Sequence, residues 1–341
     1  MRLLFLSDGT EDYLADSVLL GLRELVDVEV VDLPRRDFLY ADCPTQVRAQ
    51  VRGHGFTLYT GLLRADPCDR SQIAAKLAGG YFDLVIIADA WRAFGHFVQW
   101  RPYLNPANTI FLDGADTPQV YCHAVYWWRR PYYWGLPRAS RGFLYFKREW
   151  TSETQFNLWH RAVPRFARRF LPQYGGLRRI AFAIPGSKIV PEVPAKTKRF
   201  AQHLVDPEVA AIVPEASVKY AFASEADYYA DLQQSRYSVT TKRAGWDCLR
   251  HYEIAANGCV PCFRDLNSKP IDCAPHGLVA DVNCLAYRTA AELQAKVAGI
   301  GEVEYGRLAG GALRWARENS TAARTRALLA VWRQRQDECG N

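Results

Sequence analysis

The chain has 341 residues, of which 49% are hydrophobic and 23% are charged. This composition is typical of a folded protein and excludes a largely disordered one, and the length fits two domains of roughly 150–180 residues. No stretch approaches the ~20 consecutive apolar residues of a membrane-spanning helix. The net charge of +7 permits acidic partners: nucleoside diphosphates, anionic lipid head groups or nucleic acid.

The N-terminal half alternates apolar runs with helical patterns. The first run, RLLFLSD, is short and ends in acids, so we expect the first strand of a cytoplasmic protein instead of a secretory signal. The strands are expected over residues 2–8, 26–34, 81–89, 108–116 and 142–149, and the helices over 11–25 and 71–80. Alternating strands and helices predict an α/β fold with a doubly wound parallel sheet.

The second half repeats this pattern after a proline-containing crossing segment near residues 176–196. The pattern predicts helices over 224–235 and 246–258, a helix capped by Thr289 and Glu292, and a final helix from Ser320, and it predicts strands over 236–242, 259–265 and 277–283. We therefore expect three parts: an N-terminal Rossmann-like domain at 1–178, a C-terminal Rossmann-like domain at 179–318, and a helix at 319–341 that packs back on the first domain.

The nine cysteines are an odd number in a chain without a signal sequence, which favours reduced thiols. Cys259 and Cys262 form a C-x-x-C pair, but they lie in an apolar run that predicts a buried strand. Adjacent faces of a strand do not converge on one metal. We therefore expect no metal and no bound cofactor.

A strand, loop and helix over residues 236–258 have the layout of a diphosphate site. Lys242 and Arg243 follow the strand, Gly245 lets backbone amides approach a ligand, and the helix expected from about Asp247 offers unpaired N–H groups. Arg250 and Glu253 lie three residues apart and so project from one helix face. The alternative is that they pair with each other on a solvated surface.

The segment AGWDCLRHYEIAANGCVPCF, residues 244–263, resembles the donor-binding segment of GT-B glycosyltransferases. It is particularly similar to exostosin-like proteins and bacterial cell-envelope transferases, and the upstream residues 224–241 extend the likeness. The resemblance implies two Rossmann-like domains facing across a cleft, with the acceptor domain at 1–178 and the nucleotide-sugar donor domain at 179–318. It also implies that a glutamate, Glu253, holds the donor ribose. The donor-binding residues that we expect are Lys242, Arg243, Gly245, Trp246, Asp247, Arg250, Glu253 and Gly258.

One departure from the family pattern leaves the stereochemistry open. Many retaining GT-B enzymes carry a second glutamate seven residues before the one that matches Glu253, and that position is Gly245 here. An inverting enzyme needs a base, and the candidates at strand ends or in loops are Asp8, His54 and Asp113, with Asp89 and Asp116 behind them. Each of these is equally suited to a turn or a helix cap.

The aromatic and arginine-rich stretch from Tyr126 to Arg141 has three interpretations: domain packing, an acceptor-binding wall, or a membrane-interface patch. The whole pattern favours a transferase that moves a sugar from a nucleotide-sugar donor to a glycan or lipid-linked acceptor in cell-envelope or surface polysaccharide synthesis. It would work in the cytoplasm or at the inner face of the membrane. The alternatives are a transferase that glycosylates nucleic-acid bases and an inactive nucleotide- or glycan-binding protein.

Overall fold

The computed structural model describes residues 1–51, 58–65, 68–118, 120, 142–151, 154, 164, 166–167, 175–220 and 222–340. The chain divides into two compact units. The first consists of Met1–Ala181, Pro270–Ala274 and Arg324–Asn341, and the second of Phe182–Lys269 and Pro275–Ala323. The main crossing after Ala181 lies close to the boundary expected after residue 178, whereas the return of Pro270–Ala274 to the first unit was not expected.

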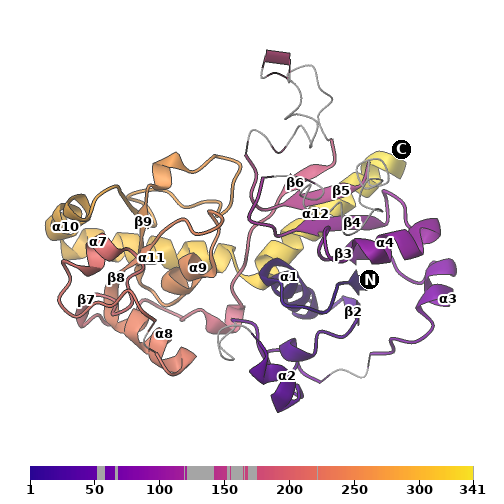
Figure 1. Ribbon diagram of the computed structural model, residues 1–341, viewed down its shortest axis with the longest axis horizontal. Coiled ribbons are helices and arrows are strands. Elements are labelled where there is room, and N and C mark those ends of the chain that lie inside the picture. The colour runs from indigo at the N-terminus through magenta and orange to yellow at the C-terminus, as the bar shows by residue number, and fades with distance from the viewer. Residues whose placement is uncertain are drawn as a thin grey trace. The chain divides into compact units, whose positions relative to one another are not determined.

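The first unit is built on a six-stranded parallel sheet (Figure 1). The strand order is β2-β1-β3-β4-β5-β6. The strands are β1 (Arg2–Leu6), β2 (Glu29–Leu33), β3 (Leu84–Ile87), β4 (Thr109–Asp113), β5 (Leu144–Lys147) and β6 (Leu177–Arg179). Strands β3, β4 and β5 are buried along their whole length, as expected when helices cover both faces of a parallel sheet.

The helices of the first unit surround this sheet. In the described part of the chain before residue 182 they are α1 (Tyr13–Arg23), α2 (Thr45–Ala49), α3 (Ile73–Ala78) and α4 (Phe94–Trp100). Helix α1 begins after Asp12, whose carboxylate accepts a hydrogen bond from the backbone N–H of Ala15 at 2.9 Å, an ordinary N-cap. The helices and strands expected in this half are confirmed, whereas β6, α2 and α4 were not predicted.

The second unit has a four-stranded parallel sheet of order β10-β9-β8-β7 (Figure 1). The strands are β7 (Lys198–Phe200), β8 (Ser235–Thr240), β9 (Val260–Arg264) and β10 (Leu285–Tyr287). The helices are α7 (Pro207–Ala210), α8 (Glu225–Gln234), α9 (Leu249–Ala256), α10 (Ala290–Gly299) and α11 (Glu302–Glu318). Two parallel sheets with flanking helices confirm the predicted α/β class.

The strand expected over 277–283 is wrong. This segment is built of turns, with Gly277 at φ +79° and Asp281 at φ +61°, and the edge strand β10 begins only at Leu285. Here the side chain of Asn283 bonds to the backbone, where a strand would have backbone hydrogen bonds to its neighbour. Its oxygen accepts from Val279 N and its amide donates to Gly277 O, both at 2.8 Å. The apolar residues of GLVADVN therefore belong to a turn that the Asn283 side chain stabilises, and not to a strand.

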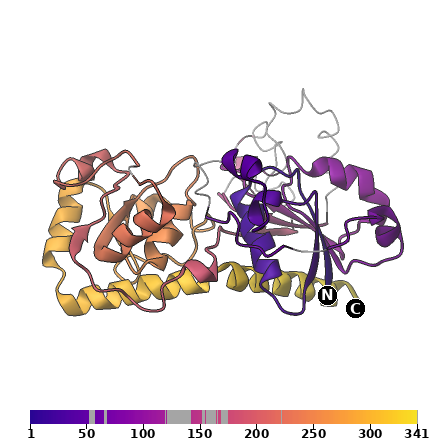
Figure 2. The same cartoon turned by 90° about the horizontal axis from the view of Figure 1, so that it is seen from below.

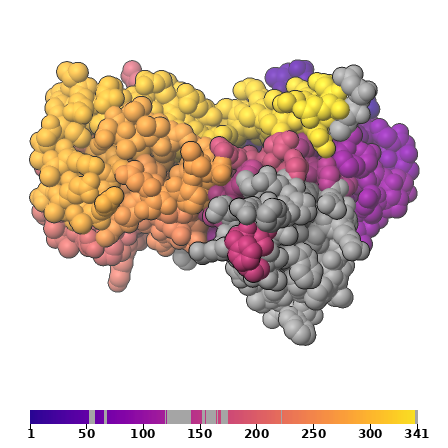
Figure 3. All heavy atoms as spheres, turned by 90° about the horizontal axis from the view of Figure 1, so that it is seen from above, coloured from indigo at the N-terminus to yellow at the C-terminus, as the bar shows by residue number. Residues whose placement is uncertain are grey.

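The last helix, α12 (Thr321–Gly340), carries the chain back into the first unit (Figure 2). Leu328, Leu329 and Trp332 are buried, and the indole N–H of Trp332 donates to Ala107 O at 2.7 Å. The outer face of α12 shows as yellow atoms on the surface in Figure 3. No helix in the described part of the chain is long and apolar enough to cross a membrane.

Candidate donor site

The loop between β8 and α9 is fixed by a histidine from the helix that follows it. Helix α9 begins at Leu249 with Cys248 as N-cap, slightly later than expected. The imidazole of His251 lies 2.7 Å from Thr240 Oγ1 through Nδ1 and 2.9 Å from Trp246 O through Nε2, and its ring stacks on Phe263. The loop is therefore held at both ends, and its backbone enters α9 in a set direction.

Asp247 anchors this loop from within. Its side chain is buried, and its two carboxylate oxygens accept hydrogen bonds from Phe182 N and from the Tyr252 hydroxyl, both at 2.8 Å. We had expected Asp247 to contact the nucleotide-sugar donor directly. Its carboxylate oxygens instead form these two hydrogen bonds within the protein. Asp247 therefore has a structural role in this loop.

The exposed side of the loop is basic. Lys242 and Arg243 are exposed, and Arg243 N donates to the carbonyl of the buried Gly245 at 3.0 Å. The Lys242 ammonium lies 5.2 Å from the centre of the Trp246 ring, and this ring packs against a small apolar cluster that includes Phe263. Two cations thus lie on the loop that leads into α9, and the dipole at the N-terminus of that helix also favours an anion.

Arg250 and Glu253 lie in the first two turns of α9 and are both half-buried. They form no salt bridge with each other in the described part of the chain, which removes the alternative of a simple surface pair. The Tyr229 hydroxyl donates to Glu253 Oε1 at 3.3 Å. Among the described residues, the buried Nη1 of Arg250 has no hydrogen-bond partner. A guanidinium with an unused buried donor is suited to an anionic ligand.

Burial raises the pKa of Glu253 to about 7, and the cation of Arg250 only partly offsets this. The nearby carboxylate of Glu225 raises it further. Glu225 itself forms an ion pair with Lys188, whose ammonium lies 5.9 Å from the Tyr229 ring. At neutral pH the Glu253 carboxyl therefore exchanges readily between its charged and neutral forms.

Four neighbours of this pair were not expected from the sequence: Lys188, His203, Glu225 and Tyr229. His203 is 7% exposed, and burial together with the Arg250 cation lowers its pKa, so its imidazole is neutral at pH 7. These residues come from three separate segments, and no spacing along the chain signals that they meet. The paired tyrosines in the helix before β8 are the only local hint.

Gly258 lies beyond the opposite end of α9 from Arg250. It has φ +65°, and a Cβ atom there would lie 2.7 Å from Pro194 Cδ and 3.3 Å from Val193 Cα. The residue must be glycine for both reasons. We had expected Gly258 to contact the nucleotide-sugar donor. It instead allows Val193 and Pro194 to pack closely against the end of α9.

Asp8 and Asp89 lie just beyond the carboxyl ends of the adjacent strands β1 and β3 in the first unit. Asp8 accepts from Thr10 N at 3.0 Å and from Thr10 Oγ1 at 2.7 Å, and it keeps 20% of its side chain exposed. Asp89 is paired with Arg92, and its pKa is raised mainly by burial. Parallel sheets bind ligands at such a strand edge, where the chain order reverses.

Asp113 is completely buried at the end of β4. Its carboxylate accepts from Lys147 Nζ at 2.8 Å and from the Tyr145 hydroxyl, both on β5. Burial lowers the pKa of Lys147. A carboxylate enclosed in this way links two strands and cannot reach the hydroxyl of a sugar acceptor. The prediction that Asp113 is the catalytic base is therefore wrong. Asp116 is tied to Arg148.

His54 and the stretch from Tyr126 to Arg141 lie outside the described residues, so their expected roles stay predictions. Cys259 and Cys262 are both buried, and burial raises the pKa of Cys259 to about 12. Within the described residues no group of three or more His, Cys, Asp or Glu side chains could hold a metal ion.

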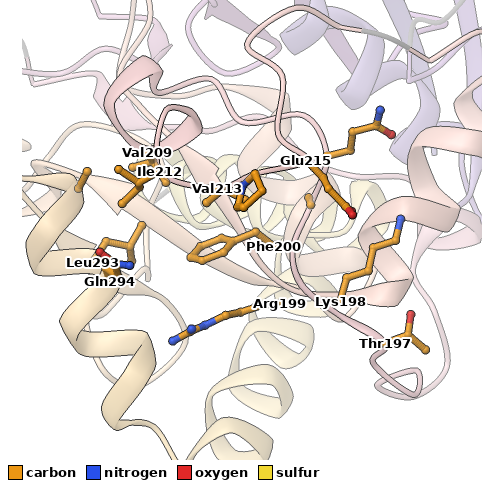
Figure 4. Close-up of a pocket in the computed structure, with 14 residues that line it drawn as sticks. Thr197, Lys198, Arg199, Phe200, Val209, Ile212, Val213, Glu215, Leu293 and Gln294 are labelled. Carbon is orange, nitrogen blue, oxygen red and sulfur yellow. The ribbon is translucent and has the colours of Figure 1, made fainter.

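A hollow of about 770 Å³ along β7 contains none of the expected donor residues (Figure 4). It is bordered by Phe200 and by the basic side chains of Lys198 and Arg199 on β7, with Val213 and Leu293 opposite. Cavity size therefore does not identify the donor site, which rests on the chemistry of the α9 residues.

The two parallel-sheet units together have the fold of GT-B glycosyltransferases. A glycosyltransferase from Rickettsia africae ESF-5 is 9% identical with a TM-score of 0.50, and the match covers 98% of this chain and 97% of that one. Anabaena HepE, solved with UDP and glucose, is 12% identical with a TM-score of 0.50, covering 97% and 98%. No family model and no curated protein matched this chain.

Proposed function

We propose that this chain is a glycosyltransferase that moves a sugar from a nucleoside-diphosphate donor to an acceptor hydroxyl. The observation that carries this proposal is the Arg250–Glu253 pair. The two ionisable groups are half-buried in the first two turns of α9, form no salt bridge with each other, and follow the loop that carries Lys242 and Arg243. A ribose diphosphate matches this arrangement, because its phosphates are anions and its hydroxyls donate hydrogen bonds.

In the proposed reaction the acceptor oxygen bonds to the anomeric carbon of the sugar while the bond from that carbon to the diphosphate oxygen breaks. The nucleoside diphosphate leaves, and a base takes the acceptor proton. Lys242, Arg243, Arg250 and the α9 dipole would stabilise the leaving charge, so the step requires no metal. Glu253 would orient the ribose. Asp8, with its partly exposed carboxylate, stays our candidate for the base.

UDP is the nucleotide to test first, because the structural neighbour HepE was solved with UDP and glucose. We further propose a glycan or lipid-linked acceptor in cell-envelope or surface polysaccharide synthesis. The support for this finer proposal is the likeness of residues 244–263 to bacterial cell-envelope transferases.

A thermal-shift screen against UDP-, GDP-, dTDP- and CMP-sugars tests the donor site. A ligand at 100 times its dissociation constant stabilises the folded protein by about 2.7 kcal/mol, which raises the melting temperature by several degrees. We expect one nucleotide series to produce this shift, Glu253→Ala and Glu253→Gln to abolish most of it, and Glu318→Ala, at an exposed carboxylate, to preserve it.

A shift that survives both Glu253 substitutions would contradict the donor site. Release of free nucleoside diphosphate in the same samples separates an enzyme from a protein that only binds. Retention on duplex DNA or RNA that falls steeply with salt would instead favour the transferase that acts on nucleic acid.

A further inference from the structure

A second basic hollow lies at the amino ends of β7 and β8. It has a volume of about 680 Å³ and is bordered by the start of both strands, the end of α10 and the start of α11. The donor residues follow the carboxyl end of β8, and the strands are parallel. The hollow is therefore at the opposite end of this sheet from Arg250 and Glu253, and the proposed function does not use it.

The border of the hollow carries four cations and one acid: Lys196, Lys198, Arg199, Arg236 and Glu302. The Lys196 ammonium donates to Gln233 O at 2.8 Å, Lys198 pairs with Asp231, which lies outside the border, and Arg236 pairs with Glu302. Arg199 is exposed and has no ion-pair partner within the described residues. The hollow thus keeps an excess of positive charge.

Two phenols in the same wall lack hydrogen-bond partners. Tyr237 and Tyr305 are 1% and 5% exposed, their rings meet edge to face at 5.6 Å, and neither hydroxyl has a partner in the described part of the chain. The guanidinium of Arg236 lies 4.3 Å from the centre of the Tyr305 ring. Buried hydroxyls are normally bonded, so two adjacent donors without acceptors indicate a place for a ligand that brings acceptor oxygens.

Helix α11 also begins at this hollow. Its N-cap residue is Gly301, which has no side chain to accept a hydrogen bond from the first backbone N–H groups of the helix. The positive end of the dipole of this 17-residue helix therefore lies at the hollow. The Glu302 carboxylate that holds Arg236 is 81% exposed on its side chain. It can swing away at little cost, and it stands where an external anion would bind.

We propose that this hollow is a second ligand site, for a phosphate group, separate from the donor site. The phosphate oxygens would pair with Arg199 and Arg236, accept hydrogen bonds from Tyr237 and Tyr305, and displace the Glu302 carboxylate. Positive charge and hydroxyl donors together match a phosphate oxyanion and no neutral ligand. The proposal does not depend on the chain being a transferase.

Calorimetric titration with inorganic pyrophosphate tests the site. The wild-type protein is titrated first as the reference, and the variants are then compared in an Arg250→Gln background, which weakens binding at the proposed donor site. We expect Arg199→Gln to weaken pyrophosphate binding about tenfold, because one charge-assisted contact is lost. Glu302→Gln should tighten binding by roughly threefold, since the competing carboxylate is gone. Tyr305→Phe should weaken binding while leaving the charge unchanged.

Arg314→Gln, at an exposed arginine farther along α11, is the matched control and should leave the affinity unchanged. Absence of pyrophosphate binding at millimolar concentration, or equal losses for Arg199→Gln and Arg314→Gln, would overturn the proposal. If Arg250→Gln changes nothing while Arg199→Gln still weakens binding, the donor site fails and this site stands.

Vesicles distinguish the two sources of the phosphate. Sedimentation with phosphatidylcholine vesicles that contain phosphatidic acid, lost in Arg199→Gln, would assign the site to a lipid head group. Pyrophosphate binding without vesicle binding would assign it to a soluble phosphate compound. Both results support the phosphate site.

Discussion

Glu253 is the residue whose protonation couples the proposed donor site to pH. Its pKa rises from an ordinary value of 4.5 to about 7, chiefly through burial. The folded protein therefore keeps this proton up to about pH 7, whereas the unfolded chain releases it near pH 4.5. The stability that the protonated carboxyl contributes is full below about pH 4.5 and is lost as the pH rises to 7.

Replacement of Glu253 by glutamine should therefore stabilise the protein at pH 8 and change little at pH 5. The expected gain at pH 8 is on the order of 1–3 kcal/mol, because the wild-type carboxylate is then charged in a partly desolvated place. Urea unfolding at the two pH values measures it. Glu318→Gln, at an exposed carboxyl, should show no such pH-dependent difference.

At this scale the sequence predicts positions better than roles. Arg250 and Glu253 could be predicted to share a face because helical spacing is a local property. The roles of Asp247 and Gly258 could not, since their partners Phe182 and Pro194 lie some 65 residues away in the chain. Asp113 was misjudged for the same reason. Asp8 and Asp113 lie at strand ends of one sheet, but only Asp113 is buried against a lysine, Lys147, from a strand 34 residues later in the chain.

At the scale of elements, α11 and the turn segment before β10 depend on one glycine. A Cβ atom at Gly311 would lie 2.3 Å from Val282 O, so the helix approaches this backbone closely. Gly306, in the same helix, is exposed and has nothing within 4 Å of the equivalent position.

The substitution Gly311→Ala should destabilise the protein by about 2–4 kcal/mol, because helix or turn must move to relieve the overlap. Gly306→Ala should instead stabilise it by about 0.5–1 kcal/mol through helix propensity. Denaturant unfolding of both variants gives the comparison. Equal effects of the two substitutions would show that α11 does not pack against residue 282 as described.

The elements that the sequence did not predict are either short, as are α2, α4 and α7, or rich in glycine, as is α11. The strands β6 and β7 are three residues each, LRR and KRF, too short and too basic to show an apolar alternation. Helix α11 contains Gly306, Gly310 and Gly311, which hide its apolar stripe. The long apolar strands of the first unit were predictable because burial on both faces leaves a continuous apolar run.

At the scale of the whole chain, α12 ties the C-terminal end of the sequence into the first unit. Trp332 is 3% exposed and donates to Ala107 O, in the turn before β4. Trp332→Ala should cost about 3–5 kcal/mol of stability. Hydrogen exchange should become faster in β4 and its neighbours and stay unchanged in β8 and β9. Arg333→Ala, at an exposed position, should leave both sheets as they are.

The same feature sets an order of assembly during synthesis. The second unit is complete once residues up to 323 have left the ribosome, whereas the first unit still lacks α12 at that moment. The half of the protein that is made first is therefore finished last. Until Leu328, Leu329 and Trp332 have been made, the first unit lacks three apolar side chains that are buried in the complete protein. A nascent chain stalled before residue 324 would be the species most exposed to chaperones and to aggregation.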